Sequence, residues 1–295
     1  MPRTIKVSHK RNSPKKELGV VGNIIPSGTL VNQAIIPSGS FPNEPATYGI
    51  IAHHQFPAAP TSANAIAGGW GNIADAKITY IADATAPTGD GRIMREALDI
   101  GELAGETIGN IWGFDSRGWA TGQASEVYIS YRVKLEDATF ENQATGTKLW
   151  FFGVGQDNSS ALNQMILFLD NDVGFRTSKS SWPLQLRTQG PAAGARNIDP
   201  NLSSGLLTCA IWHQVEVVMI INTISPSVLN NGILKIWIDG VQSHEYTNVR
   251  YRTDVYPYGF FQINNRLVWG GNDGSTKQKN DAVLVDEVYI SGLDL

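Results

Sequence analysis

The second half of the chain contains apolar segments whose length and composition constrain the fold. Residues 211–221, 233–239 and 282–290 are rich in Val, Ile, Leu and Trp, and Asn, Asp, Gly or Ser residues flank them. Short segments with many β-branched and aromatic residues are typical of β-strands, whereas buried helices need longer runs of better helix formers. The 30 Gly and 14 Pro residues also favour many short strands joined by turns. We therefore predict an all-β protein.

The same signals give ten candidate strands after residue 68. They are Lys77–Ala82, Arg92–Leu98, Glu126–Leu135, Lys148–Gly155, Gln164–Leu169, Leu184–Thr188, Ile211–Asn222, Ile233–Asp239, Tyr258–Asn264 and Ala282–Ser291. A further candidate strand, Tyr48–Ala52, precedes them. Connections such as 230–232 and 272–274 consist of Asn, Asp and Gly, which tolerate positive φ and favour turns. This pattern of short strands separated by turns predicts an antiparallel sandwich.

Alternation along three strands separates a core face from an outer face, because successive side chains of a strand point to opposite sides. The residues predicted to face the core are Val127, Ile129, Tyr131, Val133, Leu135, Val215, Val217, Met219, Ile221, Leu234, Ile236 and Ile238. The residues predicted to face outward are Tyr128, Ser130, Arg132, Lys134, Gln214, Glu216, Lys235, Trp237 and Asp239. His213 has the parity of the core residues, which favours a buried, hydrogen-bonded histidine over a general base.

Residues 1–67 differ in composition, and we predict that they form an extended arm before a sandwich domain at 68–295. The pentapeptide Ile-Ile-Pro-Ser-Gly occurs twice in the arm, at 24–28 and 35–39. Its first 16 residues contain no acidic side chain and six basic ones, which are Arg3, Lys6, Lys10, Arg11, Lys15 and Lys16. The rest of the chain holds 17 basic and 27 acidic residues. A basic segment with few apolar residues does not order itself, so the arm is predicted to be disordered or docked on an acidic surface.

Several function classes are disfavoured by the sequence. The longest apolar runs are shorter than the roughly 18–20 residues of a membrane-spanning helix, and the first 16 residues lack the apolar stretch of a secretion signal. The single cysteine, Cys209, is predicted to be a small buried residue. The acidic body disfavours direct reading of nucleic acid. No metal site or cofactor is predicted, because the His, Asp and Glu residues lack the spacing of metal ligands and phosphate-loop and dinucleotide motifs are missing.

Four segments of the sequence carry a resemblance to a known superfamily. The pattern Trp-His-x-Val-Glu-Val at 212–217 is followed by Asn-Gly-x-Leu-Lys-x-Trp-x-Asp-Gly at 231–240, and the chain closes on Val-Asp-Glu-Val-Tyr-Ile-Ser at 285–291. With Trp-Gly-Gly at 269–271, these segments resemble the concanavalin A-like lectin and glucanase superfamily, nearest to its polysaccharide-lyase-like jelly rolls. The resemblance covers residues 68–295 and implies a jelly-roll β-sandwich.

Domains of this superfamily bind glycans in a groove on one curved sheet. The resemblance implies that the outward residues of three strands line such a groove, and these candidates are Trp237, Lys235, Glu216, Gln214, Arg132 and Tyr128. Trp237 would be a stacking platform for a sugar ring. The alternative is that Trp237 covers hydrophobic surface beneath a loop.

The catalytic motifs of the superfamily are not matched. The glucanase branch needs two carboxylates on one strand face, and no Glu-x-Asp occurs in this chain. The alginate-lyase branch uses an Arg-x-Glu-x-Arg strand, a Gln-x-His strand and a Tyr-x-Lys-x-Gly strand. Here Gln214-Val215-Glu216 has Glu in place of His, and the tyrosine motif is missing. We therefore lean toward a protein without catalytic residues and leave enzyme activity open.

Three hypotheses follow. The first is a structural or decoration protein on the surface of a phage capsid or tail, assembled in the host cytoplasm as a homo-oligomer, with a trimer as our guess. Its basic arm would grip an acidic protein surface such as a capsid shell, and its jelly roll would bind glycans. The second is a stand-alone carbohydrate-binding module. The third is a divergent polysaccharide lyase or hydrolase, with Arg132, Lys235 and Glu216 converging with Tyr246 or His244.

Overall fold

The computed structural model describes residues 40–56, 72–73, 77–88, 91–105, 107–111, 123–155, 163–171, 174–189, 197–198, 206–255, 257–271 and 273–295. They belong to one compact unit, residues 36–295. Strands and turns make up all of the described part, so the all-β prediction is confirmed. The basic arm and both copies of the repeat lie outside the described residues, and the predicted arm boundary at residue 67 stays a prediction.

Strands occur along the whole described part of the chain. Their bounds are β1 Gly49–His54, β2 Asn72–Ile73, β3 Ile78–Ala82, β4 Arg92–Leu98, β5 Thr107–Ile111, β6 Ala124–Leu135, β7 Phe140–Asn142, β8 Thr147–Val154, β9 Asn163–Leu169, β10 Thr177–Lys179, β11 Ser181–Gln189, β12 Asn197–Ile198, β13 Leu206–Thr208, β14 His213–Ile220, β15 Gly232–Ile238, β16 Val241–Val249, β17 Phe260–Trp269 and β18 Asp281–Asp294.

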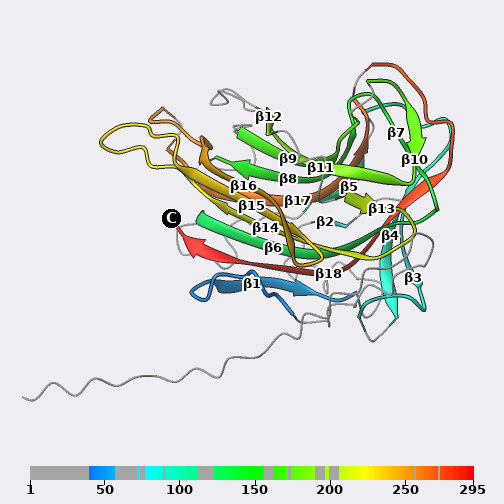
Figure 1. Ribbon diagram of the computed structural model, residues 1–295, viewed down its shortest axis with the longest axis horizontal. Helices are drawn as coiled ribbons and strands as arrows, with labels where there is room; N and C mark the ends of the chain where they lie inside the picture. Colours follow the sequence, from blue (N-terminus) through cyan, green and yellow to red (C-terminus); the bar gives the residue numbers. More distant parts are fainter. Residues whose placement is uncertain are drawn as a thin grey trace, which may run out of the picture. The chain divides into compact units, whose positions relative to one another are not determined.

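Two antiparallel sheets form a sandwich (Figure 1). In the first sheet the order is β3-β4-β18-β6-β14-β15-β16, and β1 pairs with the second half of β18. In the second sheet the order is β12-β11-β9-β8-β17-β5. The sheets meet where Phe260 of β17 pairs with Ala124 of β6. One hydrophobic core, with residues from both sheets, lies between them.

The predicted alternation places the core residues correctly. Val127, Ile129 and Tyr131 of β6 lie in the core with Val215 and Val217 of β14. The facing layer comes from the second sheet, where Trp150, Phe152, Met165 and Leu167 are buried. Burial of these large apolar side chains drives the two sheets together.

Some strands have no apolar signal in the sequence. Strand β16 has the sequence Val-Gln-Ser-His-Glu-Tyr-Thr-Asn-Val and pairs with β15 at the edge of the first sheet. An edge strand with a wet outer side needs few apolar residues, so periodicity did not predict it. The candidate strand at 48–52 is observed as β1, where it adds to β18.

Candidate functional site

The outer face of the first sheet contains the six residues that the resemblance implied for a glycan groove. Four of them are at most 3% exposed, and these are Tyr128, Arg132, Gln214 and Glu216. Lys235 and Trp237, on β15, are half-buried. The parity of all six was predicted correctly, but four of them face other parts of the chain.

Residues 40–48 cover this face at its centre. The amide of Asn43 donates to Glu216 Oε2 at 2.8 Å, and Tyr128 donates to Glu216 Oε1 at 2.6 Å. Gln214 donates to the carbonyl of Ser40 at 2.9 Å. These contacts satisfy a carboxylate that would be costly to bury alone. An open groove over Glu216 and Gln214 would require this segment to leave.

An aromatic contact holds the same segment in place. The Phe41 ring stacks on Tyr289 of β18 with ring centroids 3.8 Å apart, and Tyr289 donates to Glu44 at 2.7 Å. Trp237 packs against the small cluster of Tyr128, Val218 and Tyr289. Its surroundings therefore match the packing alternative, and its role in glycan binding stays a prediction.

The two further lyase candidates do not join Arg132 on the outer face. His244 is 4% exposed and lies opposite Ile236, a core residue, and burial lowers the pKa of His244 to about 4. Tyr246 packs against the core cluster. Arg132 donates to Glu287 at 3.0 Å, in a buried ion pair. The predicted buried histidine, His213, is confirmed, because it is 3% exposed and contacts Asp239 Oδ2 at 2.7 Å.

The outer face of the second sheet has a different character. Phe151, Ile166, Phe168 and Val268 form an apolar cluster there, separate from the core. Lys148 of β8 is paired with Phe168 on one side and Val268 on the other. Since directly paired residues share a face, Lys148 lies within this cluster.

Two arginines stand over the aromatic rings of the cluster. The Arg187 guanidinium lies 4.7 Å from the centre of the Phe168 ring, and the Arg266 guanidinium lies 5.3 Å from that of Phe151. Such cation–π contacts fix a guanidinium in a partly dry setting. The Arg187 Nε is buried and has no hydrogen-bond partner among the described residues.

This face is cationic and strands β8, β9, β11 and β17 contain no Asp or Glu. Burial lowers the pKa of Lys148, and the charges of Arg187 and Arg266 lower it further. Polar amides surround the three cations, since Gln185 is paired with Phe168 and Asn264 with Phe151. The arrangement suits an anionic ligand with ring faces and hydroxyl groups.

Comparison with known proteins identifies the fold. Over 82% of this chain and 98% of the other, the structure is similar to a marine PL-14 alginate lyase from Aplysia kurodai, with a TM-score of 0.57 and 14% identity. It is also similar to the alginate lyase Aly36B over 83% and 97% of the two chains, with a TM-score of 0.54 and 16% identity. The chain has a jelly-roll fold. At these identities the likeness concerns the fold alone. No protein-family model and no curated protein matches the sequence.

The jelly roll has neither a metal cluster nor a membrane-spanning helix in its described ranges. No three His, Cys, Asp or Glu side chains there are grouped to hold a metal ion. Among the same residues, no helix is long and apolar enough to cross a membrane.

Sequence reasoning missed the cationic face of the second sheet because it selected residues by the motifs of the resemblance. A usable signal was present in the strand sequences. The strands that hold Lys148, Arg187 and Arg266 contain no acidic residue. Which of those strands become neighbours depends on the sheet order, and periodicity does not supply it.

Proposed function

We propose that the jelly roll binds an acidic polysaccharide of the polyuronate type on the outer face of its second sheet and cleaves it by β-elimination. The observation that carries the proposal is the grouping of Lys148 with Arg187 and Arg266 over an aromatic floor. Two guanidinium groups can bind and neutralise the carboxylates of a polyuronate. The similarity of the fold to that of alginate lyases also supports a polyuronate as the substrate.

Lys148 is the candidate general base. Neutralising a uronate carboxylate acidifies the C5 proton. The lowered pKa of Lys148 makes its amine neutral at a lower pH than that of an ordinary lysine, so that it can accept this proton. As the C5–H bond breaks and Nζ–H forms, the electron pair makes a C4=C5 double bond and the C4–O bond to the leaving sugar breaks. The ammonium then returns its proton to the leaving oxygen, so the base is regenerated. The product is an unsaturated uronate that absorbs in the ultraviolet.

The first test is ultraviolet absorbance during incubation with alginate, glucuronan and polygalacturonate. We expect absorbance to rise with at least one polymer and the rise to be lost, by about 100-fold or more, in Lys148→Met. Lys148→Arg should keep binding but not cleavage, because a guanidinium does not act as a base near neutral pH. The matched control is Lys134→Met, which removes a half-buried lysine from the outer face of the first sheet, where Lys134 pairs with Asp83 at 2.6 Å.

Absence of cleavage by the unaltered chain with every polymer would overturn the lyase assignment. Binding without cleavage would leave a carbohydrate-binding module, which is the second hypothesis drawn from the sequence. The display on a phage particle, the trimer and the attachment through the basic arm stay predictions, since the arm lies outside the described residues.

A further inference from the structure

The amine of Lys148 is held by a turn that follows β17. Its Nζ donates to the backbone carbonyl of Gly270, the residue directly after Trp269. We infer that buried Lys277 is a positioning residue for Lys148 and acts through Trp269 and Gly270. The contacts are observed whatever the function of the protein, but their importance for catalysis rests on the proposed function.

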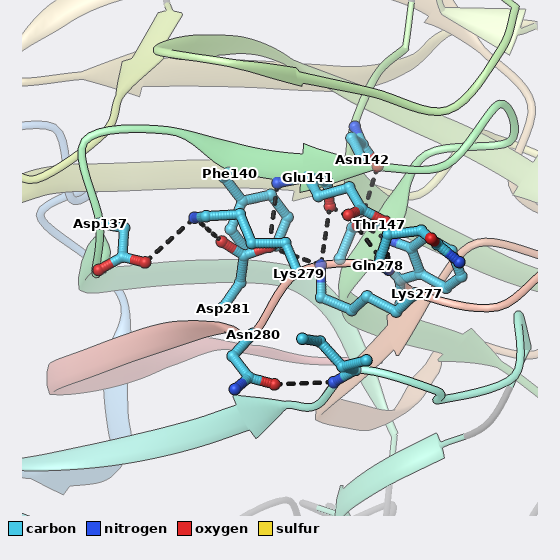
Figure 2. A network of polar contacts seen from close by, with 12 residues as sticks. Asp137, Phe140, Glu141, Asn142, Thr147, Lys277, Gln278, Lys279, Asn280 and Asp281 are labelled. Carbon is cyan, nitrogen blue, oxygen red and sulfur yellow. Dashed lines mark hydrogen bonds and ion pairs between the residues drawn. The ribbon is translucent and has the colours of Figure 1, made fainter.

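Lys277 is 0% exposed, which is rare for a lysine. Its Nζ lies 5.2 Å from the centre of the Phe140 ring and 5.3 Å from that of Trp269. It donates to Asp281 Oδ2 at 2.5 Å and to the carbonyl of Glu141 at 3.3 Å (Figure 2). The ammonium therefore occupies a fixed place between two rings, a carboxylate and a carbonyl.

Trp269 shares an acceptor with Lys277. Its indole Nε1 donates to the same Glu141 carbonyl at 3.0 Å, and the ring is 0% exposed. The lysine and the indole are thus fixed relative to the same point of β7. Because Trp269 cannot shift without breaking this contact, the start of the following turn is also fixed.

Gly270 links the buried Trp269 to Lys148 on the outer face of the second sheet. Its amide donates to the Gly146 carbonyl at 2.9 Å, and its φ of +69° is one that side chains rarely tolerate. A Cβ at this residue would lie 2.9 Å from Gln143 Cγ and 3.1 Å from Ala104 Cβ. The turn at Gly270 is thus closely packed, and its carbonyl accepts from Lys148 Nζ.

Stability alone is a poor reason for such a buried ion pair. Removing two charges from water costs several kcal/mol, and apolar replacements are often as stable. Asp281 also has a second cation, because Lys279 pairs with it and with Asp137 at the surface. Asp281 thus has a cation partner besides Lys277, whereas the cation that lies over the Trp269 ring is Lys277.

The two lysines provide a matched pair of variants in the full-length protein. Lys277→Met keeps the apolar stem and leaves Asp281 paired with Lys279, whereas Lys279→Met removes the other partner of Asp281 and leaves Trp269 untouched. The rate at which a small amine-acylating reagent labels Lys148 is measured by peptide mass spectrometry from pH 6 to 11. We expect the labelling midpoint of Lys148 to rise toward that of an ordinary lysine in Lys277→Met, as the amine moves into water, and to stay unchanged in Lys279→Met.

Equal midpoints in the native protein and Lys277→Met would overturn the inference, as would equal shifts in both variants. If Lys277→Met does not unfold cooperatively, Gly270→Ala replaces it, because this change alters the turn without touching Lys277. An unchanged midpoint in Gly270→Ala then overturns the inference. Labelling requires no polysaccharide, so the two proposals can fail separately. If the native chain shows no lyase activity but the Lys148 midpoint still shifts in Lys277→Met, the proposed function is refuted and the positioning role is supported. With activity, the pH profile of cleavage should shift in the same direction.

Discussion

At the scale of single residues, the outer face of the first sheet has an unusual pair of adjacent acids. A bulge between Asp286 and Tyr289 interrupts the pairing of β18 with β6, and Glu287 adopts a positive φ of 41°. Both carboxyls are buried. Glu287 binds Arg132, whereas Asp286 accepts from Thr88 and from the Glu287 amide. The positive φ is tolerated because these contacts hold both carboxyls in place.

The burial of Asp286 predicts a dependence of stability on pH. Burial is the main cause that raises the pKa of Asp286 to about 6. A raised carboxyl pKa means that the folded state binds the proton more tightly, so the contribution of Asp286 to stability is present at low pH and is lost as pH rises from about 4 to 6. Asp286→Asn removes this titration. The stability of the native chain relative to Asp286→Asn should fall by at most about 3 kcal/mol over that range, measured by urea unfolding at each pH. A constant difference would contradict the assignment.

At the scale of elements, β1 and the residues before it close one face of the sandwich. Strand β1, in blue beside the red β18 in Figure 1, pairs with it from Gly49 to His54. The segment at 40–48 continues over β14 and β6. The centre of the outer face of the first sheet is therefore covered by the chain itself.

Weakening this cover should affect the segment and leave the second sheet unchanged. Phe41→Ala removes the ring that stacks on Tyr289 and should lower the free energy of unfolding by about 1–3 kcal/mol. Hydrogen exchange at 40–56 should accelerate, while exchange in β8 and β9 should not. Phe175→Ala is the control, because that ring is 63% exposed. Equal exchange at 40–56 in both variants would show that the stacking contact does not hold the segment.

At the scale of the whole molecule, the two sheets differ in charge. The strands of the first sheet contain both acids, such as Glu126 and Glu245, and bases, such as Arg95 and Lys235, whereas β8, β9, β11 and β17 contain no acid. The chain has a formal net charge of −4. A polyanion is therefore attracted locally by the cationic face, although the chain as a whole is acidic.

Binding of a polyuronate should consequently weaken with salt. Screening at about 0.1 M reduces the attraction between charges more than roughly 10 Å apart, so affinity measured by calorimetry should decrease between 20 and 300 mM NaCl, on the order of tenfold. The decrease should be smaller in Arg187→Gln. A neutral polysaccharide of equal length is the control and should show little salt dependence. Salt-independent polyuronate binding would place the anion site elsewhere.

The sequence by itself determined the strand class, most strand positions and the core. Val127, Ile129 and Tyr131 alternate with polar residues, and burial of one strand face needs only that local period of two. It also determined the outward parity of Glu216 and Gln214, and predicted buried His213.

Tertiary structure alone decided which outer face is covered and which carries the cations. Asn43 and Glu216 are 173 positions apart, and Lys148, Arg187 and Arg266 come from three strands. Their grouping follows from sheet order and from packing of the segment at 40–48. These contacts form between residues far apart in the chain and leave no local period, so a pattern along the sequence could not reveal them.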